Sequence, residues 1–296
     1  MVYTYTTLYL TKFIKNELFN KYLELIGCDN DDELFYHIKQ KHNNICVISS
    51  SLYISNFEDI KHITTLFFKD IDNIYNRIHY FKNNVKNVFL LNNIKILPSY
   101  YFNYYRNLRS ICLSNKLESI GNNCFECCVR LEKIYMSNSI TTLYNNIFNN
   151  CLSLENVRLS SNIDNIPNNC FISCQSLKKI VLPNGILKIG FNAFARCYEL
   201  QEIIFNNSVK EIMNNAFFIC KKLKNVDINN NIDEIGESAF EYCASLESIN
   251  IKSHHVNFKT KTFYHCKKLK KAHISKKYRN NLIPYFSKKR IKHTFF

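Results

Sequence analysis

The amino-acid sequence predicts a solenoid of stacked repeats, each with one short parallel strand, behind an α-rich N-terminal cap. Three observations carry this prediction: a strict 23-residue period, an apolar–polar–apolar pattern inside each period, and helical spacing of apolar residues near the start. A fixed period of about 20–50 residues is typical of solenoids, because each unit needs its neighbours to bury its apolar side.

A phenylalanine recurs every 23 residues over most of the chain. The column consists of Phe102, Phe125, Phe148, Phe171, Phe194, Phe217, Phe240 and Phe263. Three residues after each phenylalanine comes a cysteine, except in the first repeat, which has Tyr105. The cysteines are Cys128, Cys151, Cys174, Cys197, Cys220, Cys243 and Cys266. A leucine column and two aliphatic columns follow at fixed offsets, so five columns stay in register without an insertion.

The repeat unit ends in L-x-x-I-x-L, an alternation that is typical of a short strand with one buried face. Glycine or proline shares one position, as at Gly121 and Pro167, where we expect a sharp turn. The F-x-x-C spacing fits one helical or 3₁₀ turn that faces inward. The predicted fold class is therefore a curved leucine-rich-repeat solenoid with one short parallel strand per repeat and an N-terminal α-rich cap.

The period divides the chain into three segments. Residues 85–274 form the solenoid of eight repeats plus an opening half repeat, because Val85 to Leu90 precede the first full strand by one period. Residues 1–84 are predicted to be an N-terminal helical cap or adaptor module, and residues 275–296 a basic C-terminal tail.

Within the first segment, the apolar residues from Leu8 to Leu25 recur at helical spacing. The run 45–54 has the composition of a strand, and the stretch from Phe57 to Phe81 reads as one or two further helices. A small helical cap over the first repeat is our preferred interpretation of this segment.

The F-x-x-C-x-x-L-x-x-I-x-L unit at 23-residue spacing resembles the BspA-like leucine-rich repeats of bacterial surface antigens, amoeboid and flagellate parasites and some large DNA viruses. The resemblance covers roughly residues 85–274. It implies a leucine-rich-repeat fold and a role in adhesion, partner binding or host interaction.

The formal net charge of +15 is concentrated at the C-terminal end. Residues 259–296 hold thirteen Lys or Arg and no Asp or Glu. The cluster Lys288, Lys289, Arg290 and Lys292 fits a nuclear-import or nucleic-acid patch. It also fits a solvated charged end that keeps the last repeat from pairing with another chain, and this second interpretation is preferred.

The first residues lack the basic, apolar and small-residue regions of a secretory signal. No segment approaches the ~18 consecutive apolar residues that a membrane helix requires. We therefore expect a monomer in the cytoplasm or nucleus, with no membrane association and with reduced thiols.

The candidates for chemistry are weak. Seven of the thirteen cysteines follow from the period, and the group Cys124, Cys127 and Cys128 has no distant matching pair for zinc. We expect the cysteine column to fill the core as free thiols. No histidine lies in a catalytic motif, and five glycines cannot build a phosphate-binding loop. The sequence predicts no metal, no cofactor, no catalytic residue and no enzyme activity.

The outward positions of the predicted strands vary from repeat to repeat, whereas the core columns do not. Variation along an extended concave face is how solenoids fit a partner. The predicted partner-binding residues on the concave face are Tyr135, Arg158, Val181, Ile204, Asp227, Lys133, Lys179 and Glu202.

The leading hypothesis is a non-catalytic protein–protein interaction scaffold. One alternative is a substrate receptor of a ubiquitin-ligase-like complex that docks through residues 1–84, although no leucine-proline opening of an F-box is present. A second is a surface or host-interaction antigen of the BspA-like type. Binding of nucleic acid is expected only through the basic tail.

Overall fold

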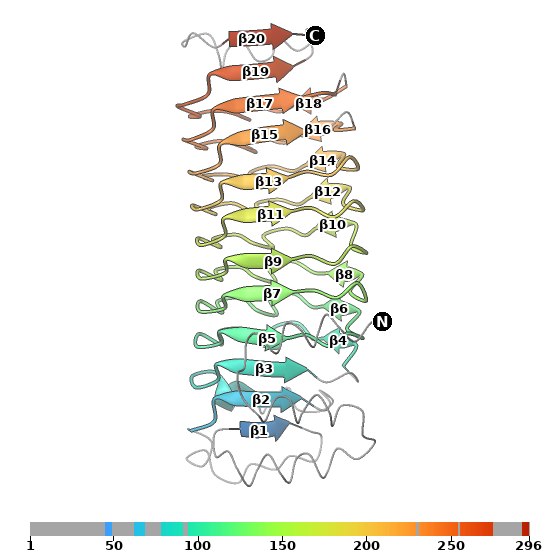
Figure 1. Cartoon of the computed structure of the whole chain (residues 1–296), viewed down its shortest axis with the longest axis vertical. Helices are drawn as coiled ribbons and strands as arrows, with labels where there is room; N and C mark the ends of the chain where they lie inside the picture. Colours follow the sequence, from blue (N-terminus) through green and yellow to red (C-terminus); the bar gives the residue numbers. More distant parts are fainter. Residues whose placement is uncertain are drawn as a thin grey trace.

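The computed structural model describes residues 45–48, 62–68, 78–90, 94–228, 231–253, 255–274 and 292–295. These residues form a stack of rungs with two rows of parallel strands, called the large sheet and the small sheet, which the hydrogen-bond ladders divide into six segments. The strands of both sheets follow one another in chain order along the long axis, the longer strands in the centre of Figure 1 and the two-residue strands to their right. The stacked repeats predicted from the 23-residue period are confirmed.

The large sheet contains one strand of three or four residues from each rung. Its strands are β1 (Ile45–Ile48), β2 (Thr65–Phe68), β3 (Asn87–Leu90), β5 (Ser110–Cys112), β7 (Lys133–Tyr135), β9 (Asn156–Arg158), β11 (Lys179–Val181), β13 (Glu202–Ile204), β15 (Asn225–Ile228), β17 (Ser248–Ile251), β19 (Lys271–Ile274) and β20 (Lys292–Phe295). All observed pairings are parallel, and those between β3 and β19 join residues one 23-residue period apart.

The small sheet was not expected, because the sequence predicts one strand per repeat. Its two-residue strands are β4 (Ile96–Leu97), β6 (Ser119–Ile120), β8 (Thr142–Leu143), β10 (Asn165–Ile166), β12 (Lys188–Ile189), β14 (Glu211–Ile212), β16 (Glu234–Ile235) and β18 (Asn257–Phe258). In each strand except the last, the second residue is an aliphatic side chain buried in the core. Two residues are too few to show a period of two in the sequence.

A single ladder of aromatic rings runs through the core. Neighbouring rings of the phenylalanine column are stacked with centroids 5.0–5.5 Å apart and planes within 12° of parallel. The rings from Phe102 to Phe240 are fully buried. The ladder shows that each rung repeats the geometry of its neighbour closely.

The expected α-rich cap is not supported by the described residues. Within residues 1–84 they contain β1, β2 and a 3₁₀ helix, η2 (Ile78–Phe81), but no α-helix. The strand predicted in the run 45–54 is confirmed at β1, whereas the helices predicted from Phe57 to Phe81 are wrong at β2. Residues 1–44 lie outside the described part of the chain.

The inward-facing turn predicted for F-x-x-C is confirmed, since the Cys151 N–H donates to Phe148 O (3.1 Å) and both side chains are buried, but the turn is not helical. Between residues 94 and 274 the described residues form turns there and no helix. Two positions per rung have positive φ, for example Asn146 (60°) and Asn150 (59°). Asparagine tolerates this left-handed backbone better than other non-glycine residues, so part of the abundant asparagine has a structural role.

Asparagine side chains also connect successive rungs beside these turns. The backbone N–H of Asn145 donates to Asn122 Oδ1 (3.0 Å), that of Asn168 to Asn145 Oδ1 (3.1 Å) and that of Phe191 to Asn168 Oδ1 (2.9 Å). Each bond satisfies a backbone donor that a turn would otherwise leave open. The amide ladder therefore holds the turns in register.

We expect Ile219→Asn to stabilise the protein. Ile219 is half-buried and has φ of 60°, a conformation that costs a β-branched residue about 1–2 kcal/mol. Asparagine at this position should raise the free energy of unfolding by about 1 kcal/mol, measured by thermal melting. Ile172→Asn is the control, because Ile172 is also half-buried but has no positive φ. This variant should be less stable than the wild type, since asparagine relieves no backbone strain there. Equal shifts for the two variants would contradict this account.

Candidate functional site

The large-sheet face is the surface formed by the outward side chains of the longer strands. Alternation places Ile134, Ile180 and Ile203 in the core and their sequence neighbours on this face. All predicted partner-binding residues lie on it. They are Lys133 and Tyr135 on β7, Arg158 on β9, Lys179 and Val181 on β11, Glu202 and Ile204 on β13, and Asp227 on β15.

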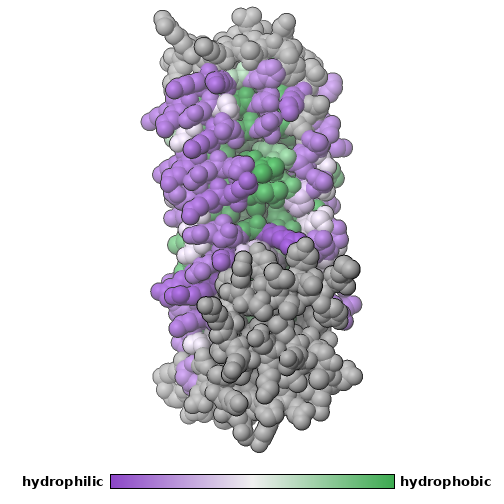
Figure 2. Space-filling view, viewed as in Figure 1, coloured by the Kyte–Doolittle hydropathy of each residue, from purple (hydrophilic) through white to green (hydrophobic). Residues whose placement is uncertain are grey.

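The middle of the large-sheet face is apolar. Val181 and Ile204 pair across β11 and β13, and their side chains are 52% and 39% exposed. Figure 2 shows an apolar strip flanked by hydrophilic surface in the upper half of the view. Exposed aliphatic side chains on adjacent strands form a contiguous apolar surface, and covering this surface with a partner is favourable because it removes apolar area from water.

The charged residues around this apolar pair are mostly paired with one another. Lys179 Nζ lies 2.8 Å from Glu202 Oε2 on the next rung. Asp227 accepts a hydrogen bond from Asn250 Nδ2 (3.0 Å), and Lys252 Nζ lies 3.7 Å from it. Such exposed pairs stabilise the fold by about 0–1 kcal/mol, so they can exchange their partners on binding.

Arg158 differs from these residues. Its side chain is exposed, and its guanidinium forms no ion pair or hydrogen bond within the described part of the chain. Its backbone oxygen accepts from the Met136 N–H (2.9 Å). It stands on the same outward column as Val181 and Ile204, next to the apolar pair. The guanidinium is therefore available to a carboxylate or an aromatic ring of a partner.

The outward positions of the large sheet are not accessible on the N-terminal rungs. Phe67 on β2 and Phe89 on β3 occupy the same outward position, yet both side chains are buried. Their rings are stacked with centroids 4.7 Å apart. The accessible part of the large-sheet face among the described rungs therefore lies from β5 onward, where Cys112 and Tyr135 are half-buried.

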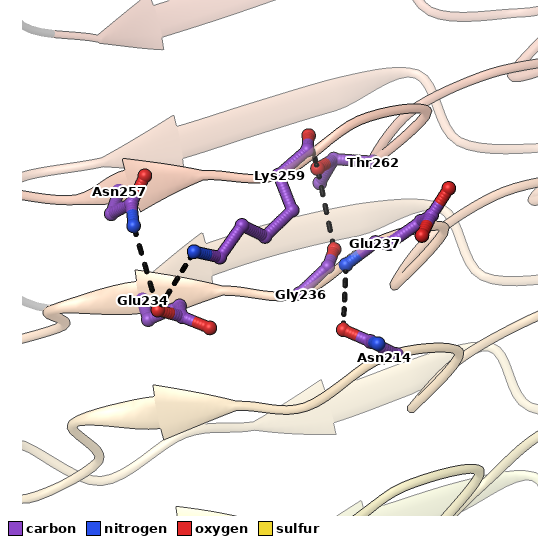
Figure 3. A network of polar contacts seen from close by, with 7 residues as sticks. All are labelled: Asn214, Glu234, Gly236, Glu237, Asn257, Lys259 and Thr262. Atoms are coloured by element: carbon purple, nitrogen blue, oxygen red, sulfur yellow. Dashed lines mark hydrogen bonds and ion pairs between the residues drawn. The ribbon is translucent and has the colours of Figure 1, made fainter.

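The small-sheet face carries ladders of polar contacts from rung to rung. Figure 3 shows Glu234 with Asn257 Nδ2 (3.5 Å) and Lys259 Nζ (3.4 Å) from the next rung around its carboxylate. Glu237 lies on the same rung as Glu234, and Asn214 lies one rung earlier. The backbone N–H of Glu237 donates to Asn214 Oδ1 (2.9 Å). These side chains satisfy one another, so the face is a structural support and a poor candidate for catalysis.

The cysteine column has the role predicted for it. Each thiol donates from Sγ to the backbone oxygen of the phenylalanine one rung earlier, as from Cys174 to Phe148 (3.2 Å) and from Cys197 to Phe171 (3.2 Å). The described cysteines are free thiols. Burial raises the pKa of Cys174 and Cys220 well above the ordinary thiol value, and it raises the pKa of Cys124 to about 12. These thiols are poor nucleophiles and poor metal ligands at neutral pH.

Comparison with protein families decides the relationship. The family model "BspA type leucine rich repeat region" matches in overlapping copies over residues 31–155, 72–201 and 141–270. The chain belongs to the BspA-type leucine-rich repeat family. The match is to a repeat family and points to no enzyme family.

Solved structures show the same fold. A leucine-rich repeat protein from Bacteroides ovatus is similar over 85% of this chain and 68% of its own, with 22% identity and a TM-score of 0.64. A leucine-rich repeat protein of T. pallidum is similar over 56% of this chain and 78% of its own, with 26% identity and a TM-score of 0.51. No curated protein sequence matches the chain.

Other expectations concern features of this BspA-type chain outside the large-sheet face. In the described ranges no group of His, Cys, Asp or Glu has the arrangement of a metal site. The same ranges contain no helix of the length and apolarity needed to cross a membrane. Of the predicted basic patch, Lys292 begins β20, whereas Lys288, Lys289 and Arg290 lie outside the described residues.

Sequence reasoning missed several exposed aromatic side chains in the loops. Tyr242 and Tyr264 are exposed on neighbouring rungs, close to His265. Tyr242 stands two residues after Phe240 and Tyr264 one residue after Phe263, at positions where the repeat pattern leaves the residue type open. Their signal in the sequence is an aromatic residue at a loop position that carries other residue types on most rungs.

Proposed function

We propose that this BspA-type protein is a non-catalytic scaffold that binds a protein partner on the large-sheet face. The observation that carries the proposal is the exposed aliphatic pair Val181 and Ile204 at the middle of an otherwise polar sheet surface. Their positions in the sheet would accept a polar residue without strain, as Asp227 shows on the next rung.

Arg158 and Tyr135 extend the proposed contact along the same column. Arginine and tyrosine are enriched among the residues that contribute most to binding, and they surround apolar anchors in many interfaces. The ion pair of Lys179 and Glu202 borders the aliphatic pair and supplies the polar rim. We therefore assign Val181 and Ile204 to the centre of the interface and Tyr135 and Arg158 to its continuation.

The test is affinity purification from the native cell with the full chain and three variants. Val181→Asp/Ile204→Asp should reduce recovery of the partner about tenfold or more, because binding would bury two carboxylates where the apolar anchors now stand. Tyr135→Ala/Arg158→Ala should weaken the same interaction.

The matched control is Ile96→Asp/Leu187→Asp. Both residues are exposed aliphatic side chains, 57% and 45%, that lie off the large sheet. This control should retain the partner. Equal recovery of every partner by the control and by Val181→Asp/Ile204→Asp would reject the large-sheet face as the binding surface.

A further inference from the structure

A cluster of aromatic rings lies on the loops that enter the last strands of the large sheet. Tyr242 and His265, one rung apart, are stacked with centroids 4.4 Å apart and planes 15° from parallel. The centroids of the Tyr264 and His265 rings are 3.9 Å apart, and the two ring planes are tilted by 59°. The Tyr242 and Tyr264 side chains are 41% and 47% exposed, so their rings are accessible at the surface.

Lysines occur on the same loop as Tyr264 and His265 and on an earlier rung. Lys267 and Lys268 follow directly in the same loop and are exposed. On an earlier rung, Lys221 Nζ stands 4.5 Å from the centre of the Tyr198 ring. We call Lys221, Tyr242, Tyr264, His265, Lys267 and Lys268 the basic aromatic edge.

Few carboxylates oppose this positive charge. Glu199 is paired with Lys222 at 2.5 Å, and Glu241 is buried. No acidic residue follows Glu247 in the chain. On the middle rungs Asn150 and Ser173 occupy the position of Tyr242, and Asn149 and Ile172 occupy that of Tyr264. Positive charge and accessible rings therefore coincide at the C-terminal rungs.

Exposed aromatic rings among lysines are the combination that binds single-stranded nucleic acid. Bases stack on the rings whatever their sequence, and ammonium groups contact the phosphates. A duplex hides the faces of its bases, and an acidic polypeptide would use the lysines but gain little from the rings. We propose that the basic aromatic edge binds single-stranded nucleic acid. This site is separate from the large-sheet face and does not depend on the function proposed for it.

The experiment measures binding of a fluorescent oligothymidylate of about ten nucleotides to the full chain by anisotropy, over a range of salt concentrations. Tyr242→Ala/Tyr264→Ala should weaken binding about tenfold or more. Lys267→Ala/Lys268→Ala should reduce the slope of log K against log salt by about 1.4. A duplex of equal length and polyglutamate should bind more weakly than the single strand.

Two matched controls keep the result specific. Tyr100→Ala/Tyr144→Ala removes exposed tyrosines from other rungs, and Lys86→Ala/Lys116→Ala removes the same charge far from the edge. Both controls should bind as wild type, and thermal melting verifies that every variant is folded. The proposal is overturned by absence of binding, by equal binding of duplex or polyglutamate, or by an unchanged affinity of the tyrosine variant. If only Lys288→Ala/Lys289→Ala/Arg290→Ala loses binding, the nucleic acid binds to the C-terminal tail, and the proposal is overturned as well.

Discussion

Phe171→Ala is expected to lower the free energy of unfolding by about 3–5 kcal/mol. The Phe171 ring is fully buried and is stacked on Phe148 and on Phe194, each with centroids 5.3 Å apart. Alanine would leave a cavity in the middle of the ladder and remove two stacking contacts at once. Because each rung contacts only its neighbours, the loss cannot be compensated elsewhere in the stack.

Chemical denaturation and thermal melting measure this effect. Phe191→Ala is the matched control, because Phe191 is the same residue type but is 39% exposed. Its removal should change stability by about 0.5 kcal/mol or less. Melting of Phe171→Ala at the wild-type temperature would show that the phenylalanine column does not form the core.

The second large effect is a loss of stability in alkali. Burial raises the pKa of six ladder thiols above their ordinary value near 9.0, namely Cys128, Cys151, Cys174, Cys197, Cys220 and Cys243. The folded protein keeps these protons, whereas the unfolded chain releases them as the pH rises past the ordinary value. The stabilising contribution is therefore fully present below about pH 9 and is lost above it.

The size of the effect follows from the number of thiols. Each thiol lowers the free energy of unfolding by about 1.4 kcal/mol for every pH unit above its unfolded pKa. The six together therefore lower it by about 8 kcal/mol per pH unit. We expect the melting temperature, measured by circular dichroism, to fall steeply as the pH rises above about 9.

Serine provides the control for the thiols. Cys174→Ser/Cys197→Ser keeps a group that can donate to Phe148 O and Phe171 O but does not titrate in this range. The slope of stability against pH above pH 9 should become shallower by about 3 kcal/mol per unit. An unchanged slope would mean that the column thiols do not govern the alkaline transition.

Sequence periodicity predicted the interior of the molecule well, because burial on identical rungs selects the same residue at the same offset. The phenylalanine, cysteine and leucine columns are all in the core. The period failed at the two ends, where the strands continue at other spacings. Ile45 pairs with Thr65, Thr65 with Asn87 and Lys271 with Lys292, which are steps of 20, 22 and 21 residues.

The candidate site was predictable in part. Alternation placed Val181, Ile204 and Arg158 on one face, and the register confirms that placement. Pairing between charged side chains was not predicted, although opposite charges one period apart, as in Lys179 and Glu202, signal it. One of the two left-handed turn positions in each rung had a signal, because asparagine occupies it on five consecutive rungs from Asn123 to Asn215. The other position had none, because a different residue type stands there on almost every rung.

Site-specific photo-crosslinking tests the binding function of the large-sheet face most directly. A photoreactive phenylalanine analogue is placed at Val181 or Ile204, and at Leu187 as the probe of an exposed position off the large sheet. We predict that irradiation in the native cell links positions 181 and 204 to the same protein, and that position 187 does not form this product. A product from position 187 with none from 181 or 204 would contradict the account.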